Sequence, residues 1–499
     1  MKKLLIILIM LSLLTSCSSK SIASNNENGS VYYEIYVGSF NDSNNDGIGD
    51  LNGITEKLDY LQALGVSGLW LMPISESDTY HKYDVIDYLS VDSNYGTMDD
   101  FENLVTEANK RHIEIILDLV LNHTASNNPW FITAKNNWLN GTCDSEDSKC
   151  DYYNFSDTAQ SGYTKINDNL YYEAQFWSEM PDLNLDNSDV RDEIKQIVDF
   201  WLDKGVKGFR LDAVLYYYAG NLSKNNEFVQ WLTDYIKTKD EDAYIVGEVW
   251  ADKTSIITSY ESGIDSLFNF TLAGNDGKIS KAISNQNGQD LAAYFVSYNQ
   301  EIKSINADAK DAIFLSNHDQ NRSAGYIFDP NKQKLAASIY LLAPGVPFIY
   351  YGEEIGMKGS GIDENKRLAM LWGENNDCDN PQNADYAHQI TTNVQEELAD
   401  DDSLLNYYKK VIAIRNKYSI FLDGTVSTFN VANQSLMALT FTDDQTSLTV
   451  IHNLSDQEVK EILSDDYQII DQISPSINAT IQNNTLTIAP YASVIIQEN

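Results

Sequence analysis

The strongest constraint on the fold is a series of eight apolar segments, rich in β-branched and aromatic residues, which alternate with segments of helical pattern. They cover residues 31–40, 66–74, 113–123, 206–214, 243–250, 266–270, 312–319 and 346–354. Between the third and fourth of them, residues 189–205 place apolar side chains at helical spacing. Short apolar strands that alternate with helices are typical of a parallel sheet covered on both faces. We therefore predict an α/β fold, a (β/α)8 TIM barrel over residues 31–420.

Two regions depart from this alternation. Residues 124–187 are polar, rich in Asn, Ser, Asp and Tyr, and lack a clean crossover helix. This stretch is too long for an ordinary connection, so we predict an inserted subdomain after the third strand, at the barrel mouth. Residues 421–499 contain short alternating runs such as LMALTF and SLTVIHNL, which predict a C-terminal antiparallel β-sandwich domain.

Composition narrows the class of partner. The chain has 499 residues, 43% of them hydrophobic, and a formal net charge of -39. Such a charge repels phosphate backbones and anionic lipid surfaces, so we expect neither nucleic acid nor an electrostatically bound membrane as a partner. A neutral substrate fits better. Nothing in the sequence indicates an obligate oligomer, and we expect a monomer.

The N-terminus has the pattern of an export signal. Lys2 and Lys3 precede an apolar run that is too short for a transmembrane helix and ends at Cys17. This pattern resembles a bacterial lipoprotein signal, which implies a signal peptide over residues 1–16, lipidation of Cys17 and a flexible tether over residues 17–30. The expected location is the cell envelope, at the outer membrane or cell surface. The alternative is an ordinary signal peptide with a chance cysteine.

Three cysteines follow Cys17. Cys143 and Cys150 lie close together in a polar stretch, and export favours a local disulfide between them. Cys378 is the third. The alternative is three thiols, because two neighbouring cysteines without further ligands make a poor zinc site.

Polar side chains stand at the C-terminal ends of four of the eight predicted strands. They are Asp118, Asn122 and His123, then Arg210 and Asp212, then Glu248, then His318 and Asp319. Active sites of TIM barrels are built on that rim, and residues two apart on a strand point the same way. Converging acids can then differ in pKa, as acid–base catalysis requires. Taken singly, each motif could also be a structural ion pair, a solvated strand end or a turn.

Four of these motifs together resemble a known family. DLVLNH, GFRLDAV, GEVW and SNHDQ are similar, in this order, to the ordered sequence regions of glycoside hydrolase family 13, the α-amylase family. The resemblance covers nearly the whole chain after the tether. MPDLN at 180–184 is similar to the extra region of the group intermediate between oligo-1,6-glucosidases and neopullulanases.

The resemblance implies a retaining two-carboxylate mechanism. Asp212 would be the nucleophile, Glu248 the general acid and then base, and Asp319 the residue that stabilises the transition state. It further implies four substrate-binding residues, namely Tyr83, His123, Arg210 and His318. The alternative for each histidine is a structural role at the rim.

Residues 42–50 predict a separate metal site. Oxygen-bearing side chains recur at every second position around glycines, a pattern suited to a hard cation such as Ca²⁺. The expected ligands are the side chains of Asp42, Asn44, Asp46 and Asp50 and the carbonyl of Ile48. The loop is not an EF-hand, because Gly53 stands where a bidentate Glu belongs. The alternative is a turn-forming loop without metal.

The sequence matches only part of a second calcium site of the family. Asn122 matches one of its ligands, but Leu215 and Tyr216 replace the Lys-His pair that often follows the nucleophile motif. The lysine usually placed near the leaving sugar is therefore missing, so contacts on the acceptor side must differ.

Two single-residue features bear on the substrate. Tyr80 stands where similar oligo-1,6-glucosidases carry an Asp that closes the site, and Ala213 resembles the α-1,4 type. We therefore expect an endo-acting α-amylase that cleaves starch, maltodextrins or maltooligosaccharides. The alternatives are a cyclomaltodextrinase or neopullulanase, an α-glucosidase, a transglycosylase, or a non-catalytic carbohydrate-binding lipoprotein.

Overall fold

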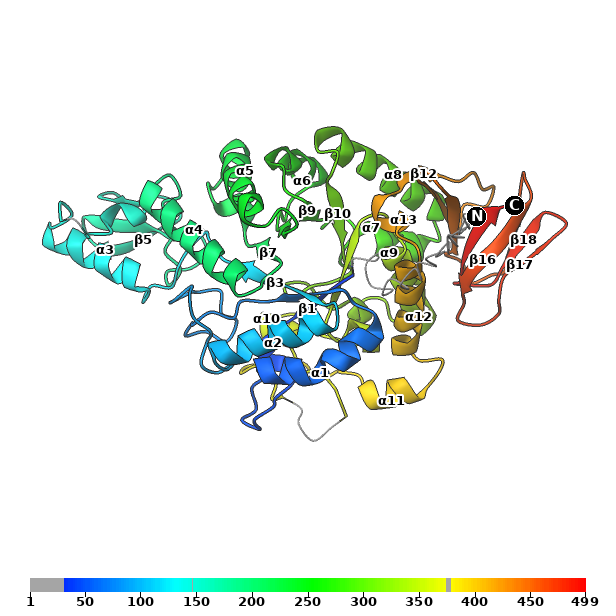
Figure 1. Cartoon of the computed structure of the whole chain (residues 1–499), viewed down its shortest axis with the longest axis horizontal. Coiled ribbons are helices and arrows are strands. Elements are labelled where there is room, and N and C mark those ends of the chain that lie inside the picture. Colours follow the sequence, from blue (N-terminus) through cyan, green and yellow to red (C-terminus); the bar gives the residue numbers. More distant parts are fainter. Residues whose placement is uncertain (1–30, 146, 374–377) are drawn as a thin grey trace, which may run out of the picture.

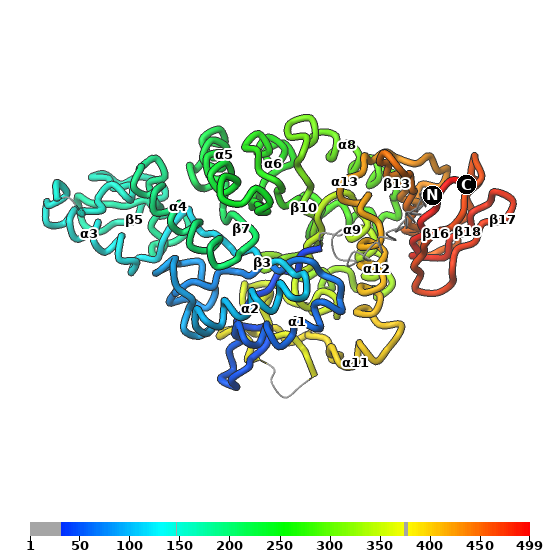
Figure 2. The backbone as a smooth tube through the Cα atoms, viewed as in Figure 1, coloured from blue at the N-terminus to red at the C-terminus, as the bar shows by residue number. Residues whose placement is uncertain are grey.

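The computed structural model describes residues 31–145, 147–373 and 378–499. A closed eight-stranded barrel forms its centre, with the inserted subdomain at one end and the C-terminal sheets at the other (Figure 1). The tube in Figure 2 follows the same path, with the insert in cyan and the C-terminal sheets in orange to red. The predicted signal peptide (1–16), Cys17 and the tether (17–30) lie outside the described residues.

All eight barrel strands are parallel, and each predicted segment contributes one of them, so the predicted fold class is confirmed. The strands are β1 (Tyr32–Ile35), β2 (Gly68–Leu71), β3 (Glu114–Leu119), β7 (Gly208–Leu211), β8 (Tyr244–Gly247), β9 (Ser266–Phe268), β10 (Lys310–Ile313) and β11 (Val346–Tyr350). Aromatic rings fill one end of the barrel, where Tyr32 stacks on Phe348 and Tyr244 with both pairs of centroids 5.1 Å apart.

Helices surround the barrel and follow it toward the C-terminus. They are α1 (Leu51–Leu64), α2 (Met98–Lys110), α4 (Ser188–Asp203), α5 (Leu222–Lys239), α6 (Lys253–Ser259), α7 (Lys278–Asn285), α8 (Gly288–Ile305), α9 (Pro330–Leu341), α10 (Asp363–Lys366), α11 (Val394–Ala399), α12 (Leu404–Lys417) and α13 (Ile420–Asp423). Side-chain caps fix their starts: Asn187 accepts hydrogen bonds from the first amides of α4. Over the described residues, no helix combines the length and apolarity needed to cross a membrane.

The inserted subdomain leaves the barrel after β3. It contains α3 (Pro129–Asn140) and a small antiparallel sheet of β4 (Phe155–Ser156), β6 (Leu170–Glu173) and β5 (Tyr163–Asn167), in that order. Asn128 caps α3, and Pro129 occupies its first turn. The predicted disulfide is present, with the Cα atoms of Cys143 and Cys150 5.6 Å apart. Cys378 is buried.

The C-terminal region consists of two antiparallel sheets. One has the order β12 (Thr425–Thr428), β13 (Leu436–Thr442), β14 (Ser447–Asn453), β19 (Ser493–Glu498), β16 (Tyr467–Ile473), and the other has the order β15 (Val459–Ile462), β18 (Thr485–Ile488), β17 (Thr480–Gln482). Buried side chains from both sheets, among them Leu436, Ile451 and Leu486, share one apolar cluster. Two sheets that enclose a common core agree with the predicted sandwich.

One glycine matters for the site. Gly208 opens β7 with φ 154°, and a Cβ at this position would lie 1.9 Å from the carbonyl oxygen of Tyr244 in β8. Only glycine permits this close approach of the two strands. The tips of β7 and β8 are thereby held side by side.

Candidate active site

The predicted polar residues gather at one rim of the barrel. Asp118 lies in β3 and Arg210 in β7, while Asp212 is the first residue after β7 and Glu248 the first after β8. Asp319 follows β10. Because parallel strands end at the same rim, side chains far apart in the sequence are brought together there.

Arg210 is the centre of this arrangement. Its side chain is 1% exposed, and its Nη1 lies 2.9 Å from Asp118 Oδ1 and 2.6 Å from Asp212 Oδ1. Its Nη2 lies 3.0 Å from Glu248 Oε2. The carboxylates of Asp212 and Glu248 therefore bind the same guanidinium and face the same cavity. Three carboxylates buried side by side would repel one another. The positive charge of the Arg210 guanidinium offsets this repulsion.

The backbone turns sharply after Asp212. Ala213 has φ 48° and ψ 41°, in the left-handed region, and a 3-10 helix over Val214–Tyr216 follows. A residue other than glycine in this region is uncommon and costs free energy. In this conformation, the N–H of Ala213 donates a hydrogen bond of 3.0 Å to Glu248 Oε2. The turn therefore orients the Glu248 carboxyl relative to Asp212.

Burial changes the acid strength of Glu248. Loss of water raises the pKa of its carboxyl, and the nearby charges of Asp212 and Asp319 raise it further, although Arg210 opposes them. A carboxyl with a raised pKa keeps its proton to higher pH, which is the property that a general acid needs.

Asp319 lies between two cations. Its Oδ2 is 3.0 Å from His318 Nε2, and its Oδ1 is 2.9 Å from Arg367 Nη2. Burial opposes ionisation, but His318 and Arg367 hold the pKa of Asp319 well below its usual range. Burial would also lower the pKa of His318, but Asp319 and the buried Glu34, 2.5 Å from His318 Nδ1, raise it to about 9. Asp319 is thus ionised and His318 protonated.

Tyr83 and His123 complete the floor of the site. The Tyr83 hydroxyl donates to Asp118 Oδ2 at 3.0 Å and lies 2.8 Å from His318 Nε2, and the two rings stack with centroids 5.6 Å apart. His123 is 2% exposed, and its Nε2 has no hydrogen-bond partner among the described residues. A buried polar nitrogen without a protein partner that borders a cavity is available to a ligand.

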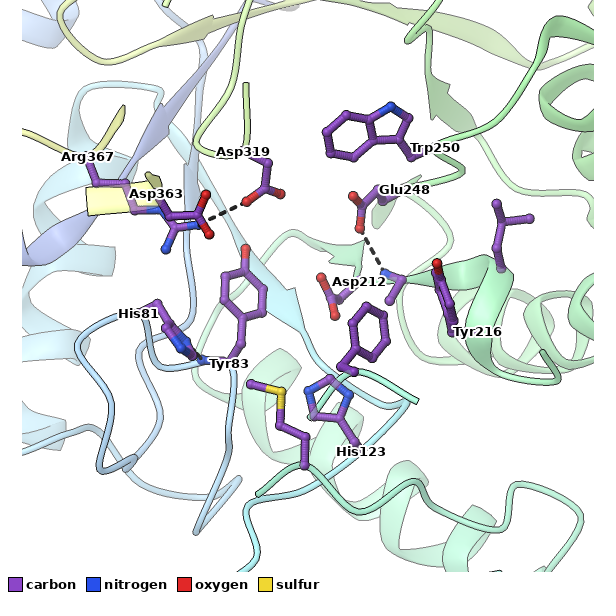
Figure 3. A pocket seen from close by; sticks show the side chains of 14 residues that line it. His81, Tyr83, His123, Asp212, Tyr216, Glu248, Trp250, Asp319, Asp363 and Arg367 are labelled. Atoms are coloured by element: carbon purple, nitrogen blue, oxygen red, sulfur yellow. Dashed lines mark hydrogen bonds and ion pairs between the residues drawn. The ribbon is translucent and has the colours of Figure 1, made fainter. Parts of the chain in front are cut away.

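These groups border a cavity of about 550 Å³ (Figure 3). Its lining consists of His81, Tyr83, His123, Phe176, Met180, Asp212, Ala213, Leu215, Tyr216, Glu248, Trp250, Asp319, Asp363 and Arg367. Five of the seven predicted catalytic and substrate-binding residues are in this lining. Arg210 and His318 lie directly behind it, in contact with Asp212 and Asp319. The arrangement can protonate, attack and position a polar neutral ligand.

Several lining residues were missed by sequence reasoning. Arg367 and Asp363 come from the chain after β11, and His81 lies two residues before the predicted Tyr83. Glu34 was also missed, although a lone acid within the apolar segment 31–40 signals a buried charge. No sequence periodicity marks Arg367, because its place depends on barrel closure.

The predicted calcium loop is folded as a set of turns. Asp42 accepts backbone N–H groups from Asn44, Asn45 and Gly47. The side chains of Asn44, Asp46 and Asp50 likewise accept from nearby amides, at Asp46, Ile48, Ser43 and Gly53. Over the described residues, no three or more His, Cys, Asp and Glu side chains are grouped to hold a metal ion. In this structure, the side-chain oxygens that would bind the ion instead accept hydrogen bonds from backbone amides in and beside the loop.

Asn122, the residue that matches the family's second calcium site, contacts the inserted subdomain. Asn122 donates to Asp182 Oδ1 at 3.2 Å, and burial raises the pKa of Asp182 to about 8. Asp182 lies in the MPDLN segment and pairs with His123 in an isolated bridge. This contact joins the inserted subdomain to the tip of β3.

Comparison with known proteins places this geometry in a family. The family profile for the alpha amylase catalytic domain matches residues 34–424, and that for the alpha-amylase SusG C-terminal domain matches residues 436–495. Alpha-amylase 3 of Dictyoglomus thermophilum is 38% identical over 482 residues, which cover 94% of this chain and 93% of that protein. The structure of Eubacterium rectale Amy13B has a TM-score of 0.91 and 39% identity, covering 95% of this chain and 96% of the other.

Relatives with other activities are similar too. Oligo-1,6-glucosidase of Bacillus cereus is 28% identical over 563 residues, covering 94% of this chain and 98% of that protein. The similarity therefore shows the kind of reaction, glycoside hydrolysis, but it does not specify which glycosidic bond is cleaved or how long the substrate chain is.

Proposed function

This chain belongs to the α-amylase family of glycoside hydrolases, and we propose that it is an endo-acting α-amylase that cleaves α-1,4-glucosidic bonds in starch, maltodextrins or related α-glucans. The proposal rests most on one observation, that Asp212 and Glu248 bind the same buried guanidinium of Arg210. A retaining glycosidase needs two carboxyls about 5 Å apart that flank the glycosidic bond to be cleaved.

In the proposed mechanism, Asp212 attacks the anomeric carbon and forms a covalent glycosyl-enzyme. Glu248 first gives its proton to the departing glycosidic oxygen, and its ionised form then takes a proton from the incoming water. The raised pKa of Glu248 suits the first step. The ionised Asp319 would accept hydrogen bonds from sugar hydroxyls and stabilise the positive charge that develops on the ring.

The remaining polar residues would hold the sugar. Tyr83 would stack beneath the ring, and His123 would donate from, or accept at, its unpartnered Nε2. His318 would position Asp319 through the contact of 3.0 Å between its Nε2 and Asp319 Oδ2. Arg210 would hold the Asp212 carboxylate in place through the ion pair of 2.6 Å between Nη1 and Oδ1.

The position of Glu248 gives the substrate a direction. Because Glu248 protonates the departing oxygen, the departing sugar must lie on its side of Asp212. In Figure 3, Trp250 and Tyr216 lie on that side, and His81, Asp363 and Arg367 lie on the opposite side. The first group would contact the departing chain and the second the chain that remains bound.

Endo action is supported by Tyr80, which contacts Arg367 at the end of the cavity away from Trp250 and Tyr216. Tyr80, which replaces the Asp that closes the site in similar oligo-1,6-glucosidases, accepts a hydrogen bond of 3.1 Å from Arg367. Tyr80 also borders a separate cavity of about 580 Å³. Without the closing Asp, the chain would be able to extend past the reacting sugar.

Ca²⁺ at residues 42–50 is a further part of the proposal. Its support is the alternating oxygen pattern and the buried positions of Asp42 and Asp50, 3% and 4% exposed. Binding would require some of these carboxylates to turn from the loop amides to the ion. The ion would stabilise the loop, and it takes no part in the proposed reaction.

We also propose that the protein is exported, lipid-anchored at Cys17 and monomeric. The Cys143–Cys150 disulfide supports an oxidising compartment. Cell fractionation tests the anchor: Cys17→Ser should move the protein from the membrane fraction to the soluble one. An unchanged distribution would refute the anchor.

Product analysis tests the activity. The purified protein should rapidly shorten amylose to mixed maltooligosaccharides, with α-anomers as the first products by NMR. Faster attack on cyclodextrin than on amylose would instead indicate a cyclomaltodextrinase, panose from pullulan a neopullulanase, and glucose from maltose an α-glucosidase. No hydrolysis of any of these would overturn the proposal.

A further inference from the structure

Glu34 is a buried acid in β1 that does not border the catalytic cavity. Its side chain is 2% exposed. Residues two apart on a strand point the same way, so Glu34 points into the barrel, one layer nearer the rim than Tyr32, whose ring stacks on Phe348. Over the described residues, the only cation in an ion pair with Glu34 is His318. A buried carboxylate with a single cationic partner depends on that partner keeping its charge.

Both ring nitrogens of His318 lie against oxygen atoms that accept hydrogen bonds. Nδ1 is 2.5 Å from Glu34 Oε1. Nε2 is 3.0 Å from Asp319 Oδ2 and 2.8 Å from the Tyr83 hydroxyl, which itself donates to Asp118. A neutral imidazole has one N–H group and one bare nitrogen, whereas the imidazolium has two N–H groups. Only the imidazolium satisfies both sides of the ring.

The other neighbours of His318 leave the Nδ1 side to Glu34. Trp70, which carries no charge, meets the His318 ring edge to face with centroids 5.6 Å apart. Arg367 donates from Nε to the backbone carbonyl of His318 at 3.3 Å, and Asp118 lies on the Nε2 side. Among the described residues, Glu34 is therefore the only charged side chain that binds Nδ1, so its substitution changes the charge on that side alone.

Burial alone would lower the pKa of the His318 ring, and the charges of Asp319 and Glu34 reverse this effect. We propose that Glu34 is a positioning residue for the reaction, which holds His318 as an imidazolium and so keeps a full positive charge, rather than a neutral N–H group, against Asp319. Glu34 does not line the cavity, so it acts through His318 and not by contact with the substrate. The inference rests on the proposed function, because that function assigns Asp319 to the reacting sugar.

Loss of the His318 proton would set its two carboxylate partners against each other. A ring protonated only at Nδ1 turns a bare Nε2 toward the Asp319 oxygen, and a ring protonated only at Nε2 turns a bare Nδ1 toward Glu34. In either case, one carboxylate loses its hydrogen bond in a buried place. Glu34→Gln removes this conflict, because an amide can donate to a bare Nδ1. The variant keeps the size of the side chain but no longer requires the charge.

NMR of ¹⁵N-histidine-labelled protein can follow the protonation of His318 directly. The chain has six histidines, and His318→Asn identifies the signal that belongs to this ring. In the wild type, His318 should lose its proton near pH 9. In Glu34→Gln, this midpoint should fall by about 1–3 units, because an opposite charge beside the ring is removed. A wild-type midpoint at or below the ordinary 6.5 would overturn the proposal without any variant.

The kinetic test uses 4-nitrophenyl α-maltotrioside, whose leaving group needs no proton from Glu248. Deprotonation of Glu248 therefore does not limit kcat/KM with this substrate, and the alkaline fall in kcat/KM should follow His318. At pH 6, Glu34→Gln should remain close to the wild type. Above both midpoints, its kcat/KM should be lower by about tenfold for each unit by which the midpoint falls. Released nitrophenol is measured after an alkaline quench.

Glu114→Gln is the matched control. Glu114 begins β3 at the opposite end of the barrel, where its carboxyl accepts a hydrogen bond of 3.2 Å from Tyr32. This variant should leave the His318 midpoint and the alkaline fall in kcat/KM unchanged. Thermal unfolding confirms that each variant is folded.

The outcomes distinguish the two proposals. An equal loss of kcat/KM at every pH in Glu34→Gln, with the His318 midpoint unchanged, would reduce Glu34 to a packing role and overturn the inference. An unchanged midpoint and an unchanged pH profile would overturn it as well, and the proposed function would stand. Absence of hydrolysis by the wild type instead contradicts the proposed function.

Discussion

The backbone N–H of Ala213 donates a hydrogen bond of 3.0 Å to the side chain of Glu248. The residue after one carboxylate therefore fixes the position of the other. The positions of Asp212 and Glu248 are therefore coupled. Their separate chemical roles can be tested by substitution.

Glu248→Gln should lower kcat/KM for soluble starch by about 10²–10⁴-fold, because the departing oxygen then leaves unprotonated. The loss should be much smaller with 4-nitrophenyl α-maltotrioside, whose leaving group needs no proton. Asp212→Asn should abolish turnover of both. Glu241→Gln, at an exposed position, is the matched control. Starch hydrolysis that persists in Asp212→Asn would refute the role of Asp212.

Arg210→Met should destabilise the fold by about 3–5 kcal/mol in urea unfolding, because buried carboxylates lose their counterion. Adding Asp118→Asn should restore part of the loss, since one unpaired charge is removed. Arg111→Met breaks ion pairs at the surface and should cost less than about 1 kcal/mol. Equal losses in the two arginine variants would contradict this account.

His318 makes stability depend on pH. Its folded-state pKa of about 9 lies above the ordinary 6.5, so the folded protein holds the proton more tightly than the unfolded chain. The resulting stabilisation is complete below about pH 6.5 and is lost as pH rises through about 9. Urea unfolding of the wild type and His318→Asn between pH 6 and 9.5 should show their difference narrowing as pH rises. A difference that widens with pH would show that the sign is wrong.

Calcium should raise the free energy of unfolding of EDTA-treated protein, by about 2.7 kcal/mol at a hundredfold excess over Kd. Asp42→Ala and Asp46→Ala should remove this gain. Magnesium at the same concentration is the control, because it demands a more rigid octahedral site. If residues 42–50 form only turns, EDTA has no effect, and Asp42→Ala destabilises the protein equally with and without calcium.

The barrel could be predicted because its physical signal is local. Strands buried on both faces require uninterrupted apolar segments, and all eight were found on that basis. The rim residues Asp212 and Glu248 could also be predicted, since the end of a strand fixes where they stand. The helix Pro129–Asn140 in the insert was not predicted, although Asn128 and Pro129 form a helix-start signal.

Other parts of the site depend on closure of the barrel, which no local pattern encodes. Arg367 reaches Asp319 only because the chain after β11 returns to the rim. The loop at residues 42–50 shows a different limit, because alternating Asp and Asn side chains satisfy backbone amides as readily as they bind a cation. Sequence alone does not distinguish these two uses.

The direction of β1 bears on the proposed anchor at Cys17. β1 runs parallel to the other barrel strands, so Val31 enters at the face opposite the catalytic rim. In the proposed anchored form, the catalytic rim would therefore lie at the end of the barrel away from the point where the described chain begins. With attachment at that end, the cleft would remain accessible to polymers in the medium.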